Sequence, residues 1–412
     1  MPTLNKIGTV LSRSSRTPAT EPALRRLRIA LTLFFAVDGF LFAGWVVRIP
    51  AIKAQVGASA SQLGLALLGV SAGAVATMML TGRLCRRFGS DRVTVGTAAM
   101  LSLSIALPPL THSALELGLV LLVFGIAYGG LNVAMNSVAV DLVAALRRPV
   151  MSSFHAAYSC GGLIGSSLGG LLAPHLSPTV HLSLLTPVGL LTVLLAGRVL
   201  LGTPLQAPPE QIEPEQIEPE QSAAPGTTVR RTGLLVALFG LIAACSTYGE
   251  GALAEWGPLH VQQDLHRGPG IAAAGYAAVT LAMTLGRLSG TALLVRLGQT
   301  RVLVLGALTA AGGMLLAALA PLLPLVVLGF ALTGLGLSNT FPTTIARAGA
   351  LTGPGGVAAA STFGYGGLLL GPPTIGFLTD AVGLPTALTT VSVLGAVAAV
   401  IAYGVRNIGR PA

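Results

Sequence analysis

The chain has 412 residues, of which 53% are hydrophobic and only 9% are charged, whereas soluble domains carry about 25% charged residues. A chain this apolar would aggregate in water, so the composition excludes an ordinary soluble protein and indicates that a lipid bilayer is its solvent. The net charge of +10 raises the alternative of nucleic-acid binding. We reject that alternative because the basic residues follow a membrane topology, described below.

The chain opens on a polar, basic stretch, residues 1–27, which predicts a cytoplasmic tail. No short apolar core with a cleavage site follows it, so we expect no cleaved signal peptide. Apolar runs of about 20 residues, the length that crosses a bilayer as a helix, then recur along the chain. The first six predict an N-terminal bundle over residues 28–201, with spans at 28–48, 61–82, 92–111, 116–142, 150–173 and 179–200.

Residues 202–232 separate this bundle from a second group of spans. The segment is rich in proline and repeats the sequence Glu-Gln-Ile-Glu-Pro, and such a composition cannot bury enough surface to fold. We expect an extended cytoplasmic linker there. Six further runs predict a C-terminal bundle over 233–405, followed by a cytoplasmic tail over 406–412, with spans at 233–256, 270–293, 301–320, 322–346, 356–380 and 384–405.

The second half of the chain repeats the first at a nearly constant offset. Val70–Val93 aligns with Val279–Val302, an offset of 209 residues, and the same shift carries Gly125 onto Gly334 and Phe154 onto Phe363. Duplicated helical bundles are the architecture of many solute carriers, whose site lies where the halves meet. The predicted fold class is an all-α integral membrane protein with twelve transmembrane helices in two pseudo-symmetric six-helix bundles.

The basic residues fix the predicted orientation. Of the 24 lysines and arginines, twenty fall in segments on one side of the predicted membrane, three (Arg48, Lys53 and Arg267) on the other, and Arg287 lies within a span. Because lysine and arginine favour cytoplasmic segments, both termini are predicted to be cytoplasmic. The basic charge is therefore explained by topology, and nucleic acid is not an expected partner.

The turn between spans two and three carries a recognisable motif. Glycines there allow a tight reversal and arginines hold the turn at the cytoplasmic surface. The turn resembles the loop signature of the major facilitator superfamily, Gly-x-Leu-x-Asp-Arg-x-Gly, in Gly82, Leu84, Arg87 and Gly89. Arg86 stands where that family usually has aspartate. The family's charge relay at the inner gate then requires another acid, for which the candidates are Asp91 and Asp141.

With its twelve spans, its central linker and a degenerate second copy of the turn at Arg296–Arg301, the chain resembles this superfamily over essentially its whole length. The resemblance implies a carrier in the plasma (inner) membrane of a bacterium that works as a monomer and needs no cofactor. The long Gly/Ser-rich fifth span and the acid in span one are most similar to sugar-permease-like members. Span five, with Gly161, Gly165 and Gly169, is also similar to the glycine-rich motif of proton-coupled exporters; close helix packing is the alternative explanation.

Acids inside the predicted membrane are the leading functional candidates, because an ionisable side chain there is costly and usually faces a cavity, a partner or a proton route. Asp38 lies near the middle of span one, and Glu250 lies at a similar place in span seven, the symmetry-related helix. We predict that Asp38, and secondly Glu250, couples transport to protons. The alternative is a structural ion pair of Glu250 or Glu255 with Arg48, which would itself form a gate at the outer mouth.

Other polar side chains predict the wall of a binding site. Trp45 either shares a helix face with Asp38 or anchors span one at the membrane surface. Span four presents three polar side chains at i+4 steps, which either bind a polyol or sugar or bond to neighbouring helices. His155 titrates near physiological pH and is a further candidate for proton transfer. The predicted substrate-binding residues are Asp38, Trp45, Tyr128, Asn132, Asn136, His155, Tyr158, Asn339 and Tyr365.

Nothing in the sequence predicts an enzyme. There is no Gly-x-x-x-x-Gly-Lys loop for ATP, and the histidines and three cysteines do not have metal-ligand spacing. We therefore expect a secondary transporter that moves a small polar, sugar-like solute by alternating access, coupled to protons. Two alternatives remain, an exporter of drugs or amphipathic metabolites and a membrane nutrient sensor that binds without transport.

Overall fold

The computed structural model describes residues 21–146, 150–203, 227–352 and 354–406. These residues form fourteen α-helices and one 3-10 helix, and no strand is found among them. The predicted tails and linker fall largely outside the described residues. The N-terminal half comprises α1 (Glu21–Val46), α2 (Ile49–Gln55), α3 (Ala60–Phe88), α4 (Ser90–Ser104), η1 (Pro108–Leu110), α5 (Ala114–Leu146), α6 (Met151–Leu172) and α7 (Pro178–Gly202).

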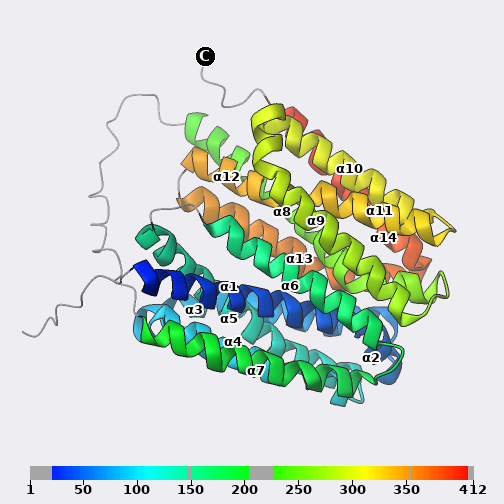
Figure 1. Cartoon of the computed structure of the whole chain (residues 1–412). Helices are drawn as coiled ribbons and strands as arrows, with labels where there is room; N and C mark the ends of the chain where they lie inside the picture. Colours follow the sequence, from blue (N-terminus) through cyan, green and yellow to red (C-terminus); the bar gives the residue numbers. More distant parts are fainter. Residues whose placement is uncertain (1–20, 147–149, 204–226, 353, 407–412) are drawn as a thin grey trace, which may run out of the picture.

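The C-terminal half lies beside the N-terminal half, with its helices along the same general direction (Figure 1). Its helices are α8 (Thr227–Gln263), α9 (Pro269–Leu297), α10 (Gln299–Leu319), α11 (Leu323–Leu337), α12 (Thr340–Thr352), α13 (Pro354–Val382) and α14 (Leu384–Gly404). Ten helical segments of the described chain are long and apolar enough to cross a membrane, with α11 and α12 counted as one segment. The remaining long helices, α6 and α13, complete the twelve crossings that the sequence predicts.

The tenth predicted span is not one continuous helix. The structure divides residues 322–346 between α11, which ends at Leu337, and α12, which begins at Thr340. Pro342 explains the break, because a proline has no backbone N–H to donate to the carbonyl four residues earlier and is tolerated in the first turn of a helix. Asn339 lies in the break and donates from Nδ2 to the Gly286 carbonyl of α9 at 2.8 Å. The side chain at the break thus ties this part of the chain to α9.

Positive backbone angles end α3 and α9 at equivalent places in the two halves. Gly89 has φ of +91° and Gly298 has φ of +77°, a region that suits residues without a Cβ. Each glycine N–H bonds back into the preceding helix, from Gly89 to the Cys85 carbonyl at 2.9 Å and from Gly298 to the Leu294 carbonyl at 3.0 Å. The two residues are related by the offset of 209 that the sequence predicts.

The helix packing repeats with the same offset. A Cβ added at Gly125 of α5 would lie 2.1 Å from the Val70 carbonyl oxygen of α3, and one added at Gly334 of α11 would lie 2.8 Å from the Val279 carbonyl oxygen of α9. Both glycines thus allow two helix backbones to approach closely, as small residues do in membranes. Val70 and Val279 both line the cavity described below, so the duplication sets the two walls of the site.

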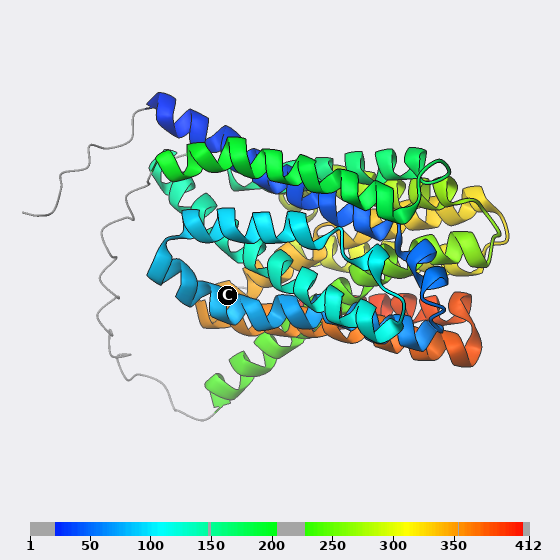
Figure 2. The ribbon, with the colours of Figure 1, turned by 90° about the horizontal axis from the view of Figure 1, so that it is seen from below.

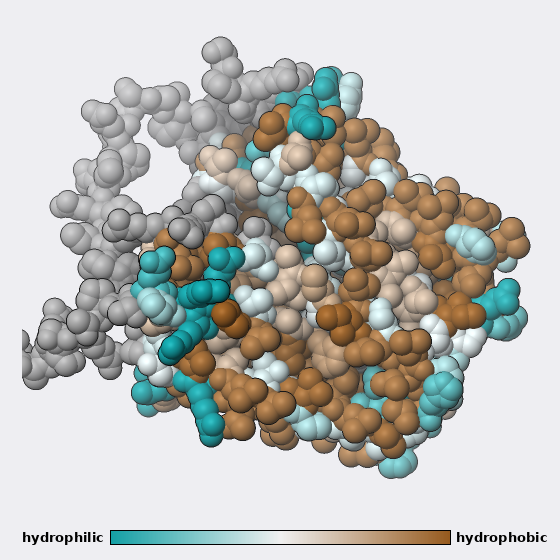
Figure 3. Space-filling model, viewed as in Figure 1, coloured by the Kyte–Doolittle hydropathy of each residue, from teal (hydrophilic) through white to brown (hydrophobic). Residues whose placement is uncertain are grey.

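The two halves meet along α3 with α13 and α6 with α9. The starts of α1 and α8 lie at the same end of the molecule (Figures 1 and 2). We call this the basic end, because it carries the exposed Arg86, Arg87, Arg296 and Arg301; the opposite end, which carries α2, is the α2 end. Figure 3 shows hydrophobic side chains over the middle of one face and hydrophilic ones toward both ends. This distribution suits an integral membrane protein.

Candidate functional site

A cavity of about 220 Å³ lies between the two halves, near the middle of the long helices. Residues of α1, α3, α5 and α6 line it from one half, and residues of α8, α9, α12 and α13 from the other. Its polar lining residues are Ser71, Tyr128, Tyr158, Ser159, Thr247, Glu250, Glu255, Tyr276, Thr280, Arg287 and Tyr365. The position agrees with a solute site at the seam of a duplicated bundle.

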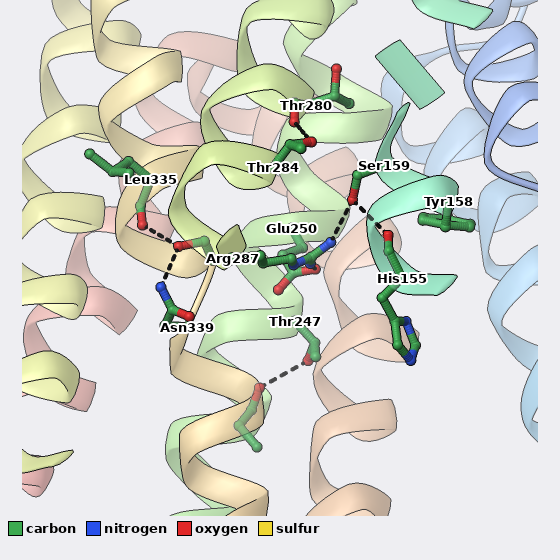
Figure 4. Close-up of polar contacts among 12 residues, drawn as sticks. His155, Tyr158, Ser159, Thr247, Glu250, Thr280, Thr284, Arg287, Leu335 and Asn339 are labelled. Atoms are coloured by element: carbon green, nitrogen blue, oxygen red, sulfur yellow. Dashed lines mark hydrogen bonds and ion pairs between the residues drawn. The ribbon is translucent and has the colours of Figure 1, made fainter. Parts of the chain in front are cut away.

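An ion pair crosses this cavity. Arg287 of α9 lies 3.6 Å from Glu250 of α8, measured from Nη2 to Oε2. The same guanidinium donates from Nη1 to Ser159 Oγ of α6 at 3.4 Å, and Figure 4 shows it pointing between these two residues. Arg287 therefore connects the C-terminal half to the N-terminal half. Both charged side chains stay partly exposed to the cavity, 33% for Arg287 and 29% for Glu250.

Tyrosine hydroxyls supply most of the neutral polar groups in the cavity wall. Tyr128 and Tyr158 are hydrogen-bonded through their hydroxyls at 2.9 Å, and Phe42 stacks on Tyr128 with ring centroids 5.1 Å apart. Tyr276 and Tyr365 line the other half. Four of the six tyrosines of the chain thus face one cavity. Aromatic rings with hydroxyl tips can both pack against a solute and bond to it.

Asp38 is fully buried in α1, and neither of its carboxylate oxygens has a hydrogen-bond partner in the described structure. It does not line the cavity; its neighbour Gly39 does. Gly39 packs so tightly that an added Cβ would lie 2.0 Å from the Tyr158 carbonyl oxygen. Asp38 therefore lies behind the lining of the cavity, beside a residue of α1 that belongs to it.

Several predicted binding residues lie elsewhere in this conformation. Trp45 is 2% exposed and packs near Phe124 in the core of the N-terminal half, so it neither lines the cavity nor lies at the protein surface. Asn136 donates to the Asn132 carbonyl of its own helix at 2.8 Å, and Asn339 donates to the Gly286 carbonyl of α9. These residues are absent from the cavity wall: Trp45, Asn132, Asn136, His155 and Asn339. Tyr128, Tyr158 and Tyr365 are part of it.

His155 lies one turn from the cavity on α6. Its ring packs edge-on against Phe35 with centroids 5.5 Å apart, and Figure 4 shows the ring directed away from Glu250 and Arg287. The residue is exposed. Its place in the site is therefore on the side of the basic end, outside the lining.

Arg48 does not pair with a glutamate of the described chain; it contacts His181 and a backbone carbonyl instead. Arg48 is 2% exposed, and it donates from Nε to His181 Nδ1 at 2.8 Å and to the Ala173 carbonyl at 3.4 Å. All three residues belong to the N-terminal half, so these contacts do not join the two halves. Glu250 instead pairs with Arg287, and Glu255 lines the cavity without an ion pair among the described residues.

The sequence reasoning missed a contact between the halves at the α2 end. Asp380, at the end of α13, accepts hydrogen bonds from the backbone N–H groups of Ala60 at 3.1 Å and Ser61 at 2.8 Å. These N–H groups belong to the first turn of α3. Nearby, Lys53 of α2 lies 3.5 Å from Gln263 of the other half; burial lowers the pKa of Lys53, while Asp380 and Asp264 act to raise it. Only the position of Asp380 at the end of a predicted span hinted at this contact.

The motif at the basic end forms a compact turn. A Cβ added at Gly89 would lie 2.4 Å from Asp91 Oδ1, and Asp91 lies in the first turn of α4, where a carboxylate is favourable. Arg87 is exposed and lies over the Phe88 ring at 5.2 Å. Gly82 and Asp141 are partly buried. None of the ion pairs that the structure describes includes Asp91 or Asp141, so the relay predicted for these acids stays a prediction.

Twelve membrane crossings in two similar halves, with a cavity that holds both apolar and polar side chains at their seam, define a solute carrier of the membrane. The chain belongs to the Major Facilitator Superfamily, whose profile matches residues 29–346 and, in a second match, residues 258–412. It is therefore a transporter and not an enzyme.

Relatives and solved structures agree with this family. The chain is 33% identical over 371 residues to an uncharacterized transporter, y4wD, of Sinorhizobium fredii, covering 89% of this chain and 95% of the relative. It is 28% identical to the membrane protein MosC of Rhizobium meliloti, covering 92% of this chain and 90% of the relative. A structure of the nucleoside transporter NupG matches with a TM-score of 0.72 at 15% identity, covering 93% and 100% of the two chains. A D-xylose–proton symporter matches with a TM-score of 0.69 at 14% identity, covering 91% and 97%. These two likenesses show the fold.

Proposed function

We propose that this carrier moves a small polar, sugar-like solute across the plasma (inner) membrane of a bacterium by alternating access, coupled to protons. The observation that supports this most is the cavity at the seam, with four tyrosine hydroxyls and the Glu250–Arg287 pair on its wall. Such groups suit a ring with several hydroxyls, because the aromatic faces pack against C–H groups while the hydroxyls and charges bond to O–H groups.

The size of the cavity supports a small solute. Its volume of about 220 Å³ is below the range of about 300–1,000 Å³ that is typical of pockets for drug-sized ligands. Solved carriers named for nucleosides and for D-xylose share this fold. We extend that chemistry to this chain as part of the proposal.

We propose that the basic end faces the cytoplasm, together with both termini, since basic segments favour that side. The described hydrogen bonds between the two halves all lie in one part of the seam. This part extends from Ser159, at mid-membrane, to Asp380, at the α2 end. Closure at the α2 end corresponds to a state in which the solute site communicates with the cytoplasm. The carrier would act as a monomer, with bundles over 28–201 and 233–405 joined by a linker over 202–232.

Asp38 is the proposed proton-coupling residue. A buried carboxylate without a partner is costly as an ion, and a proton removes that cost. A proton biases the two transport states only if its affinity differs between them. Movement of the C-terminal half against the wall formed by α1 and α6 would change the surroundings of Asp38, which gives such a difference. Glu250 and His155 remain secondary candidates, Glu250 through its pairing with Arg287.

The test is uptake by the purified chain in proteoliposomes, with monosaccharides, nucleosides, amino acids and cationic drugs each supplied with and without an imposed pH gradient. The solutes are first screened for an increase in the thermal stability of the purified chain, and those that stabilise it are then used in the uptake assay. The proposal expects gradient-driven accumulation of a sugar-like solute. Accumulation of the drugs alone would establish the exporter instead, and binding without flux would establish a sensor.

One observation favours the alternative that the chain exports amphipathic metabolites. About half of the lining residues are apolar, including Phe42, Val70, Met283, Phe341 and Leu368. Gly161 and Gly165 of the exporter-like motif pack against the α1 backbone, however, since an added Cβ would lie 1.9 Å from the Ala36 carbonyl oxygen and 2.5 Å from that of Phe40. The motif is thus accounted for by close packing.

A further inference from the structure

We propose that the transported solute carries a protonated amine in addition to its hydroxyl groups, and that Glu255 is the counter-charge of this amine. The inference rests on the function proposed above and narrows its solute class to small amino polyols, such as amino sugars. The inference is based on Glu255 because, of the two carboxylates among the described residues of the cavity wall, it is the one without an ion-pair partner.

Glu255 combines burial with access to the cavity. Its side chain belongs to the cavity wall, yet the residue is only 6% exposed. Its Oε2 atom is buried and has no hydrogen-bond partner among the described residues. The ion pairs formed by the described residues do not include it. An ionised carboxylate buried in this way is costly unless a cation or a proton accompanies it.

Glu250 shows what Glu255 lacks. Both glutamates lie on α8 and face the same cavity, and Glu250 has Arg287 at 3.6 Å. The described lining residues thus contain two carboxylates and one guanidinium, and the other polar groups are neutral hydroxyls. When Glu255 is ionised, its charge has no counterpart in the described wall, so a cationic solute would complete the charge balance and a neutral solute would not.

The surroundings of Glu255 leave room for such a group. The lining residues of α8 next to it are Gly251 and Ala254, whose side chains are absent or a single methyl. Tyr276, Phe341 and Tyr365 add aromatic rings to the same half of the wall, and aromatic faces attract ammonium groups. A charge-assisted hydrogen bond from an ammonium to a carboxylate is about twice as strong as a neutral one. Selectivity for an amine over a hydroxyl at one position of the solute follows.

The experiment compares pairs of solutes that differ at one position. The full-length carrier in detergent is titrated with D-glucosamine and D-glucose, and with D-galactosamine and D-galactose, and affinities are taken from calorimetry and thermal stability. We expect the amino member of at least one pair to bind about tenfold more tightly. N-acetylglucosamine, which keeps the nitrogen and loses the charge, should behave as the neutral sugar. Equal affinities within both pairs, including no measurable binding of either member, overturn the proposal.

Variants then place the effect at Glu255. Glu255→Gln should abolish the preference for the amine over the matching neutral sugar, and Glu116→Gln, at an exposed acid on the α2 end, should keep the wild-type preference. A preference that survives Glu255→Gln overturns the assignment. If Glu255→Gln does not fold, the wild-type comparison in sodium chloride and in potassium chloride decides: stabilisation by sodium alone, without selectivity for the amine, would identify the partner of Glu255 as the metal ion and overturn the proposal.

The outcomes separate this inference from the proposed function. Neutral sugars that bind and are transported without any advantage for their amino forms leave the proposed function intact and refute the role of Glu255. A carrier that binds neither set and instead takes up amphipathic drugs refutes both.

Discussion

The carboxylate of Asp380 caps a helix of the opposite half, accepting a hydrogen bond from the Ser61 N–H at 2.8 Å. A second bond from the Ala60 N–H at 3.1 Å uses its other oxygen. The first N–H groups of a helix have no partner within the helix, and an acid there is also favoured by the helix dipole. Ser59 and Gln62 already form a capping box at this end. Asp380 therefore completes the cap of α3 only while the α2 end is closed.

Asp380→Ala should shift the carrier toward states that are open at the α2 end. Loss of a helix cap costs about 0.5–2 kcal/mol, which corresponds to a change in population of roughly 2- to 30-fold. Spin labels at Ala54→Cys and Val382→Cys, in a chain without its three native cysteines, would report the separation of the halves. Both positions are exposed. We expect a larger long-distance fraction in the variant.

The control for this measurement is Glu116→Gln, which removes an acid at the same end that bonds to His112 within its own half. Its distance distribution should match that of the unaltered background. An unchanged distribution in Asp380→Ala would show that the cap does not hold the α2 end closed.

Two adjacent glycines of α6 should respond differently to the same substitution. A Cβ at Gly161 would lie 1.9 Å from the Ala36 carbonyl oxygen, while the nearest atom to a Cβ at Gly162 lies at 3.7 Å. Gly161→Ala forces α1 and α6 apart, and overpacking of this kind costs about 1–3 kcal/mol. Gly162→Ala, at a residue that lines the cavity, should leave thermal stability near that of the wild type. Equal thermal stability of the two variants would contradict the packing described here.

The sequence predicts the fold well because hydrophobic length, basic turns and an internal repeat each report a local property. Gly89 and Gly298 illustrate this, because the tight turn requires a positive φ and therefore favours glycine in both copies of the repeat. The ends of α1 and α8 and the break before Thr340 were less predictable. The helices α1 and α8 extend beyond their apolar runs into polar sequence, and the break follows from Pro342; the length of an apolar run reveals neither.

The candidate site could be predicted only in part. Tyr128 and Tyr158 lie on predicted polar stripes and line the cavity. Asn132 and Asn136 are instead hydrogen-bonded to each other within α5. Which side of a fully apolar helix faces the other half is a tertiary property that periodicity does not encode. The partner of Arg287 was equally hidden, because Glu250 and Ser159 reach it from two other helices.

The pairing of Arg287 with Glu250 should appear as a coupling free energy. Both side chains remain partly exposed, so we expect a coupling of about 1 kcal/mol, at the upper end of the range for solvated ion pairs. The measurement is unfolding of Arg287→Gln, Glu250→Gln and the double variant in mixed micelles. The costs of the two single changes should add up to more than the cost of the double change, since each single change leaves one charge unpaired. Strict additivity would show that the two charges do not interact. Arg301→Gln, at an exposed arginine, serves as the reference.

Asp38→Asn should separate exchange of the solute from its coupling to protons. Asparagine has nearly the shape of aspartate but carries no charge and takes up no proton, so the buried site of Asp38 is expected to tolerate it, with thermal stability equal to or above that of the wild type. Accumulation driven by a pH gradient in proteoliposomes should fall to the level seen without a gradient. Exchange of labelled for unlabelled solute at equal pH should continue, because it needs no net proton movement. Glu116→Gln should retain both activities. Gradient-driven accumulation that persists in Asp38→Asn would remove Asp38 from the coupling mechanism and direct attention to Glu250.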